Sequence, residues 1–143
     1  MIQRIQSIFL ALGAFSSFGL FATDAAETEA PVNGSELFSD AHYNLLDSPI
    51  LIGGAAGAGL LLLVAIFLFR NRPLQAILSN VALILALAYT AYGAFAWYTD
   101  SAATQAYADL GVALPFLTMI FAVLAGRYIR SDEKLVRSAD RLR

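Results

Sequence analysis

The sequence predicts an all-α membrane protein, a four-transmembrane-helix up-down bundle with both termini cytoplasmic. Of its 143 residues, 59% are hydrophobic and 14% are charged, whereas a soluble domain is nearer half apolar and a quarter charged. The apolar residues fall in four long runs. All nine Lys and Arg residues lie at alternate ends of these runs, so they can share one side of a membrane. Such a bias marks the cytoplasmic side.

The first predicted span runs from about Ile5 to Ala22, between Arg4 and Asp24. A short basic start and small residues at its end also suit a secretory signal peptide. The apolar stretch is long for such a signal, so we expect it to be retained as a membrane helix.

The second and third spans should form an antiparallel hairpin. Span two runs from about Pro49 to Phe69, and Pro49 suits a first helical position because its missing N–H would be unpaired there. Roughly 20 residues at ~1.5 Å each match a ~30 Å hydrocarbon core. A short basic turn ending at Pro73 leads into span three, from about Leu74 to Tyr98.

The fourth span runs from about Tyr107 to Tyr128 and is interrupted by Pro115. A proline inside a membrane helix frees a carbonyl, so we expect a kink there. Trp97, Tyr98 and Tyr107 cluster at the outer boundary of spans three and four, as interfacial aromatic residues do.

An acidic outer loop joins the first two spans, over residues 23–48. Its six acids are Asp24, Glu27, Glu29, Glu36, Asp40 and Asp47. The composition of its first half predicts little fixed structure. Asn33-Gly34 predicts a turn, and Ser35 could cap a short helix. A weak hypothesis is that the acids attract a divalent cation, although they lack the ordered spacing of a calcium loop.

The tail, residues 129–143, together with the end of the fourth span, is basic on one face. The bases recur at steps of three and four, as on a helix; they are Arg127, Arg130, Lys134, Arg137 and Arg141. This stripe could contact anionic lipid headgroups or an acidic partner. Equally, it could be a solvated helix whose charges only secure the topology.

The two ends of the chain resemble one family. The start, MIQRIQS, and the end, DEKLVRSADRLR, are similar to those of small bacterial four-span inner-membrane proteins catalogued as a domain of unknown function. The resemblance covers the whole chain. It implies a four-helix protein of the bacterial inner (cytoplasmic) membrane with both termini in the cytoplasm. It implies no activity, cofactor or catalytic residue.

Small residues at intervals of four predict close helix packing. Gly53 and Gly57 form a GxxxG pair in span two, and span three carries a second stripe: Ala82, Ala86, Thr90 and Ala94. Lipid tails are as apolar as Leu, so small residues that let backbones approach favour association. The stripes can serve packing within the bundle. Alternatively, one of them, Gly53/Gly57 being the first choice, can face another subunit or a second copy.

Polar residues within the spans are few. Gln75 and Asn80 lie in the inner third of span three, where such groups usually hydrogen-bond across helices. Asp109 lies at the outer end of span four. It can complement the dipole of its helix there, or mark a functional intramembrane site.

Several functional classes are disfavoured by what the chain lacks. It has no cysteine, a single histidine (His42, in the loop) and no carboxylate in the middle of a span. These absences argue against thiol redox chemistry, haem ligation and proton-coupled export. A short mixed-charge tail argues against nucleic-acid binding. We therefore predict no catalytic, cofactor or metal site.

The favoured function is a non-enzymatic accessory or scaffold subunit that packs against a larger membrane complex. The alternative is a small transport or lipid-handling protein. In that alternative Gln75, Asn80 and Asp109 line a path and Pro115 is a hinge. It predicts a water-accessible cavity between the spans.

Overall fold

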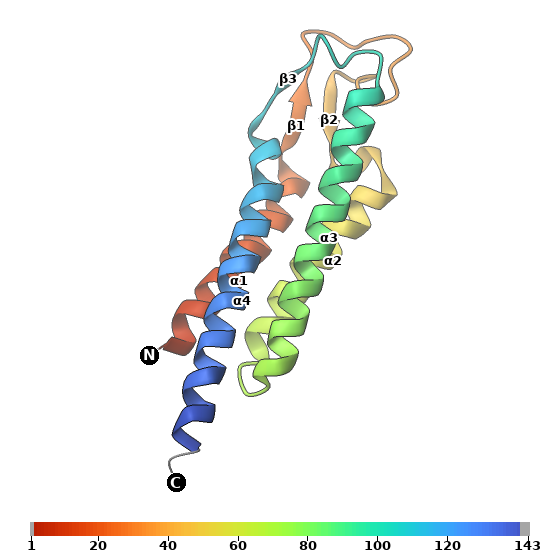
Figure 1. Ribbon diagram of the computed structural model, residues 1–143. Helices are drawn as coiled ribbons and strands as arrows, with labels where there is room; N and C mark the ends of the chain where they lie inside the picture. The colour runs from red at the N-terminus through yellow and green to blue at the C-terminus, as the bar shows by residue number, and fades with distance from the viewer. Residues whose placement is uncertain (1, 141–143) are drawn as a thin grey trace.

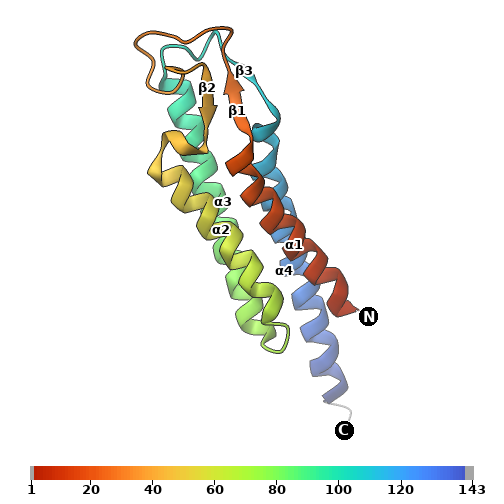
Figure 2. The same ribbon diagram turned by 180° about the vertical axis from the view of Figure 1, so that it is seen from behind.

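Four long helices form the body of the protein in a computed structural model that describes residues 2–140 (Figure 1). They are α1 (Ile2–Gly19), α2 (Pro49–Phe67), α3 (Arg72–Thr99) and α4 (Ala113–Asp140). Helix α1 packs against α2 and α4, and α3 packs against the same two helices. The helices alternate in direction (Figures 1 and 2). The expected four-helix up-down bundle is therefore present.

The two ends of the bundle differ in kind. Both chain termini and the α2–α3 turn lie at one end, which we call the turn end (Figure 1). A small sheet and the long acidic loop lie at the other, the sheet end. Since Arg70 and Arg72 lie in and just after the α2–α3 turn, basic residues gather at the turn end, as the sequence predicted.

The predicted α2–α3 hairpin is present, with slightly shifted bounds: α2 starts at Pro49 as expected but ends at Phe67 rather than Phe69, and α3 starts at Arg72 rather than Leu74. Ser48 caps α2 by accepting a hydrogen bond from the Ile50 N–H, and Pro49 follows in the first turn. The Asn71 side chain caps α3 by accepting from the Leu74 N–H, again with a proline in the first turn. Both caps satisfy backbone donors that a helix start leaves unpaired.

Helix α4 starts later than predicted. Tyr107–Ala108 form a short strand, β3, and Leu110–Val112 form a 3-10 turn, η3, before α4 begins at Ala113. Pro115 therefore lies in the first helical turn, where its missing N–H costs no hydrogen bond. The expectation that Pro115 interrupts the span is wrong. Helix α4 instead continues through the basic tail to Asp140.

A three-stranded antiparallel sheet caps the bundle, in the order β2-β1-β3. Strand β1 (Asp24–Glu27) is central and pairs with β2 (His42–Asn44) and β3. The all-α expectation omitted this sheet, and the expectation of little fixed structure in the first half of the loop is wrong for β1. The strands have only four, three and two residues. They are too short to show the alternation of polar and apolar residues by which a strand is recognised in a sequence.

Two hydrophobic clusters fill the bundle, and they differ in side-chain size. The cluster toward the turn end is rich in alanine and has Leu10 and Leu62 at its centre. The cluster toward the sheet end contains Phe38, Tyr43 and Leu45 from the loop, packed against residues of α2 and α3. The loop thus supplies core side chains for the half of the bundle at the sheet end.

Candidate functional site

The buried glutamines near the turn end join three helices. The Gln6 Nε2 of α1 donates to the Gln75 Oε1 of α3 at 3.3 Å, and the Gln75 Nε2 donates to the Ala65 carbonyl of α2 at 2.9 Å. Both glutamine side chains are fully buried. The predicted polar candidate Gln75 is therefore a structural cross-link between helices.

Helices α3 and α4 are joined by three further polar contacts. The Ser79 hydroxyl donates to the Ala122 carbonyl at 2.9 Å, and Arg130 Nη2 donates to Asn80 Oδ1 at 3.1 Å. A partly buried ion pair also joins Arg72 Nε to Asp132 Oδ2 at 3.1 Å. Asn80, like Gln75, thus holds two helices together.

The basic stripe of the tail is only partly free of the bundle. Arg127, Arg130 and Lys134 are exposed, although Arg130 reaches back to Asn80. Asp132 points to the other side of α4, toward Arg72. The predicted contacts Arg137, by its side chain, and Arg141, entirely, lie outside the described residues.

The glycines of α2 that fit closely against a neighbour are not the predicted pair. A Cβ added at Gly54 would lie 2.6 Å from the Tyr89 Cβ of α3, and one at Gly59 would lie 3.0 Å from the Phe18 ring of α1. A Cβ at Gly57 would make an ordinary 3.5 Å contact with Leu85. A Cβ at Gly53 would meet nothing within 4 Å. The bundle thus needs Gly54 and Gly59 rather than Gly53.

The small-residue stripe of α3 serves two purposes. Ala82 and Ala86 are fully buried between the helices, as predicted for packing positions. One and two turns further on, Thr90 and Ala94 line a cavity instead. The stripe therefore marks where α3 changes from close packing to bordering an open space.

That space is an apolar cavity of about 200 Å³ beneath the sheet. Its walls come from α2, α3, the start of α4 and the loop; they include Leu20, Tyr43, Thr90, Trp97, Pro115 and Phe116. Phe116 and Ala94 are also exposed on the outer surface of the bundle. The cavity thus borders the exposed surface between α3 and α4.

A second, more polar cavity of about 680 Å³ lies between the loop and the ends of α2 and α3. Glu36, Asp47, Tyr92 and Asp100 are among its lining residues. Asp109 lines neither cavity; it is exposed, and its backbone N–H donates to the Ala25 carbonyl at 2.9 Å. The structure thus places Asp109 at the boundary of the bundle, between strand β3 and the turn η3.

Asp100, at the end of α3, fastens the loop to the bundle. Its carboxylate accepts from the Ser35 hydroxyl at 2.7 Å and from the backbone N–H groups of Glu36 and Leu37 at 3.2 and 3.3 Å. It also accepts from the Ala102 N–H at 2.8 Å. Partial burial opposes ionisation, but these hydrogen bonds outweigh it and lower the pKa of Asp100 below its usual value.

These bonds explain why the helix predicted at Ser35 does not form. The Ser35 hydroxyl does accept from the Phe38 N–H at 2.8 Å, as a cap would. However, the N–H groups of Glu36 and Leu37 bind Asp100, and the chain bends over it. The turn predicted at Asn33-Gly34 is present. No local pattern in the sequence indicates this role of Asp100, because its partners in the loop are more than sixty residues away.

Tyr43 is the second anchor that the sequence did not reveal. Its hydroxyl donates to the Gly93 carbonyl of α3 at 3.0 Å, and its ring lies edge-on to Trp97 and near Phe38. Burial, with the nearby negative charge of Asp47, raises the pKa of Tyr43 to about 12. Tyr43 thus stays a neutral hydrogen-bond donor at physiological pH.

These features define a multi-pass membrane protein. All four helices are long and apolar enough to cross a bilayer, and several of their polar side chains bond to neighbouring helices. The family model described as a domain of unknown function, DUF4293, matches residues 2–142. The chain belongs to this family. Comparison with curated proteins and with solved structures finds no match.

Proposed function

We propose that this protein is a non-enzymatic accessory or scaffold subunit of the bacterial inner membrane. Its turn end would lie in the cytoplasm, because Arg70, Arg72, Arg127 and Lys134 flank the spans there and such an excess sets orientation. The acidic loop and sheet would then face the opposite side. Its partner would be a larger membrane complex or a second copy of this chain.

The observation that carries this proposal is that polar side chains within the spans form hydrogen bonds between helices of the bundle. Gln75, Ser79 and Asn80 all bind neighbouring helices. Near the sheet end, Ser17 of α1 likewise donates to the Ala55 carbonyl of α2 at 2.7 Å. Such contacts are worth ~0.6 kcal/mol each on average and fix helices in one register. The bundle is thus built as a rigid body that can support a partner.

The face of α2 around Gly53 is the surface we assign to docking. Gly53 is exposed, and Ile50, Leu60, Val64 and Phe67 lie exposed along the same helix. A glycine inside a helix costs roughly 0.5–1 kcal/mol relative to alanine. Packing within the bundle does not need a glycine at position 53. Close approach of a helix from a partner would need one, and the resulting contact would offset the cost of the glycine.

Co-purification from membranes in mild detergent tests the docking surface. We expect Gly53→Leu to lose the partner while the bundle still folds, because the new side chain extends into open space. Ala88→Leu, at an exposed small residue of α3, is the matched control and should keep the partner. Gly57→Leu is less clean because it would press on Leu85. An unchanged set of bound proteins in Gly53→Leu would count against docking through this face.

A second candidate function is lipid handling at the sheet end, which the apolar cavity favours. In the membrane, its border at Ala94 and Phe116 would face acyl chains. A path through Gln75, Asn80 and Asp109 receives no such support, because the first two are bonded within the bundle. Ala94→Trp should fill the cavity and reduce lipid retained in native mass spectrometry. Ala88→Trp, outside the cavity, should not; equal retention in both variants would remove the lipid hypothesis.

A further inference from the structure

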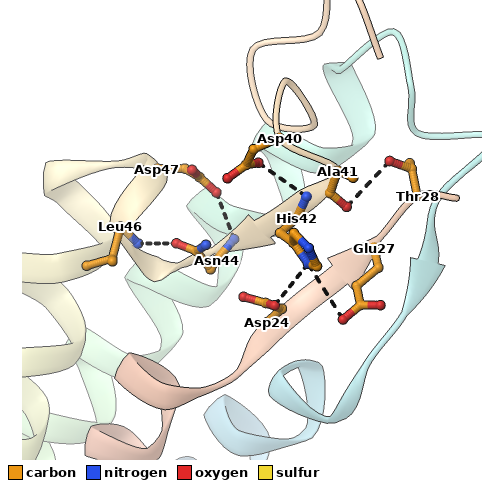
Figure 3. A network of polar contacts seen from close by, with 9 residues as sticks. All are labelled: Asp24, Glu27, Thr28, Asp40, Ala41, His42, Asn44, Leu46 and Asp47. Atoms are coloured by element: carbon orange, nitrogen blue, oxygen red, sulfur yellow. Dashed lines mark hydrogen bonds and ion pairs between the residues drawn. The ribbon is translucent and has the colours of Figure 1, made fainter. Parts of the chain in front are cut away.

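A histidine and two carboxylates meet on the surface of the sheet (Figure 3). His42 Nδ1 lies 3.1 Å from Asp24 Oδ2 and 3.7 Å from Glu27 Oε1. One ligand atom from each residue lies within 4.8 Å of the other two. In Figure 3 the imidazole of β2 points toward β1 and lies between the two acidic side chains. The three groups are half exposed, so an ion in solution can reach them.

The sheet brings these residues together through its register and one irregularity. Glu27 is paired directly with His42 across the β1–β2 ladder. In a regular strand, Asp24 and Glu27 would point to opposite faces, because side chains alternate. The register shifts between Asp24 and Ala26, and such a bulge re-aims side chains. Both carboxylates therefore reach the same imidazole.

We propose that Asp24, Glu27 and His42 form a binding site for a divalent transition-metal ion, with Zn²⁺ as the reference ion. Ligand atoms ~2.1 Å from a tetrahedral Zn²⁺ lie roughly 3.4 Å apart. The two measured separations, 3.1 and 3.7 Å, lie on either side of this value. The Asp24 and Glu27 oxygens lie within 4.8 Å of each other, so side-chain rotations can bring all three ligands onto one ion.

The donor set selects the class of metal. An imidazole nitrogen suits Zn²⁺ and related transition ions, whereas Ca²⁺ and Mg²⁺ prefer sites made of oxygen alone. Three protein ligands leave the fourth position of Zn²⁺ to water. The site on this chain therefore differs from the loose calcium attraction that six scattered acids would give.

The surroundings of the site are negative. Asp40 accepts from the His42 backbone N–H at 3.2 Å. Burial raises the pKa of the Asp47 carboxyl above its usual value, and the negative charges of Asp40 and Asp24 raise it further. A hydrogen bond from the Asn44 N–H opposes this rise but does not cancel it. Carboxylates that repel one another in this way attract a cation. A bound ion would link β1 to β2 and so hold the two ends of the loop together.

Titration of Zn²⁺ into the full-length protein in detergent, followed by calorimetry, tests the site. We expect saturable binding of one ion and a rise in the melting temperature. His42→Ala and Glu27→Gln should each weaken binding by at least roughly tenfold, since even the loss of an outer-shell group costs 10–100-fold at metal sites. Ca²⁺ and Mg²⁺, titrated in parallel, should bind much more weakly than Zn²⁺.

Glu29→Gln is the matched control, because it removes the same charge from an exposed residue beside the site. It should leave Zn²⁺ binding unchanged. Absence of saturable binding would overturn the proposal and reduce the cluster to a polar contact of His42 with Asp24 and Glu27. Equal binding by His42→Ala, Glu27→Gln and the unmodified chain would also overturn it. Because these side chains are exposed, circular dichroism should show all the variants folded.

Discussion

The turn end and the sheet end of the bundle are held together in different ways. At the turn end the helices touch through alanines, and Gln75, Ser79 and Asn80 bond directly to neighbouring helices. At the sheet end, helices α3 and α4 border a cavity. There the loop supplies Phe38, Tyr43 and other core residues.

The difference teaches that the acidic loop is a structural part of the bundle rather than an appendage. In lipid, close contact between small residues supports helix association better than burial of large apolar side chains. The turn end uses that contact. The sheet end has such a contact too, of Gly54 with Tyr89, but it is also held by anchors from the loop, chiefly Tyr43 on Gly93 and the bonds to Asp100.

The largest expected effect distinguishes two neighbouring glycines. Gly54→Ala should destabilise the bundle by about 1–3 kcal/mol, because its Cβ would overlap the Tyr89 Cβ and neither atom can rotate away. Gly53→Ala should be neutral or stabilising, because nothing lies within 4 Å and alanine favours a helix. Thermal unfolding in detergent measures both. Equal melting temperatures in the two variants would mean that α2 is rotated differently against α3.

A smaller effect is expected when the loop loses its anchor. Asp100→Asn removes the negative charge that four hydrogen-bond donors share, and we expect a loss of about 1–2 kcal/mol in loop docking. Limited proteolysis within residues 33–38 should become faster. Asp109→Asn, at an exposed acid outside this network, is the control. Resistance to protease that matches the unmodified chain would show that Asp100 does not hold the loop.

The same contact should depend on pH. The pKa of Asp100 is lower in the folded state, below the value of ~3.9 expected when unfolded. Its contribution to stability is therefore present above pH ~4 and is lost as the pH falls through the folded pKa. Loop protection should weaken on acidification below that point in the unmodified chain. In Asp100→Asn this component of the pH dependence should disappear.

The smallest expected effect lies at the turn end. Ser79→Ala removes one bond between α3 and α4 and should cost ~0.6 kcal/mol, the average for such contacts in membranes. Ser131→Ala, at an exposed position of α4, should cost less. If Ser79→Ala lowered the melting temperature more than Asp100→Asn does, the contact at the turn end would be the stronger of the two, contrary to this account.

The sequence predicted the helices well because each signal is local. Hydropathy places the four spans, and Pro49 and Pro73 mark helix starts that the structure confirms. The start of α4 was missed because Tyr107 pairs with β1, a partner far away in the chain. Pro115 was predicted to kink the helix for the same reason: a proline kinks a helix only in its interior, and α4 begins just two residues before it.

The candidate sites were less predictable because they depend on helix rotation and long-range contacts. Gly53 and Gly54 carry the same spacing signal, and only the facing Tyr89 shows which one packs. Asp100 gives no sign in the sequence of the residues that it binds. His42 looked like an isolated surface residue, because its two acidic neighbours come from another strand and a bulge.

Hydrogen exchange of the loop amides in lipid nanodiscs tests most directly whether the loop is a fixed part of the bundle. The N–H groups of Thr28, Val32 and Ala41 each donate to a backbone carbonyl within the loop. We predict that these amides exchange at least about a hundredfold more slowly than in an unstructured peptide, as amides in stable structure do. Exchange at the unstructured rate throughout residues 24–47 would contradict the account.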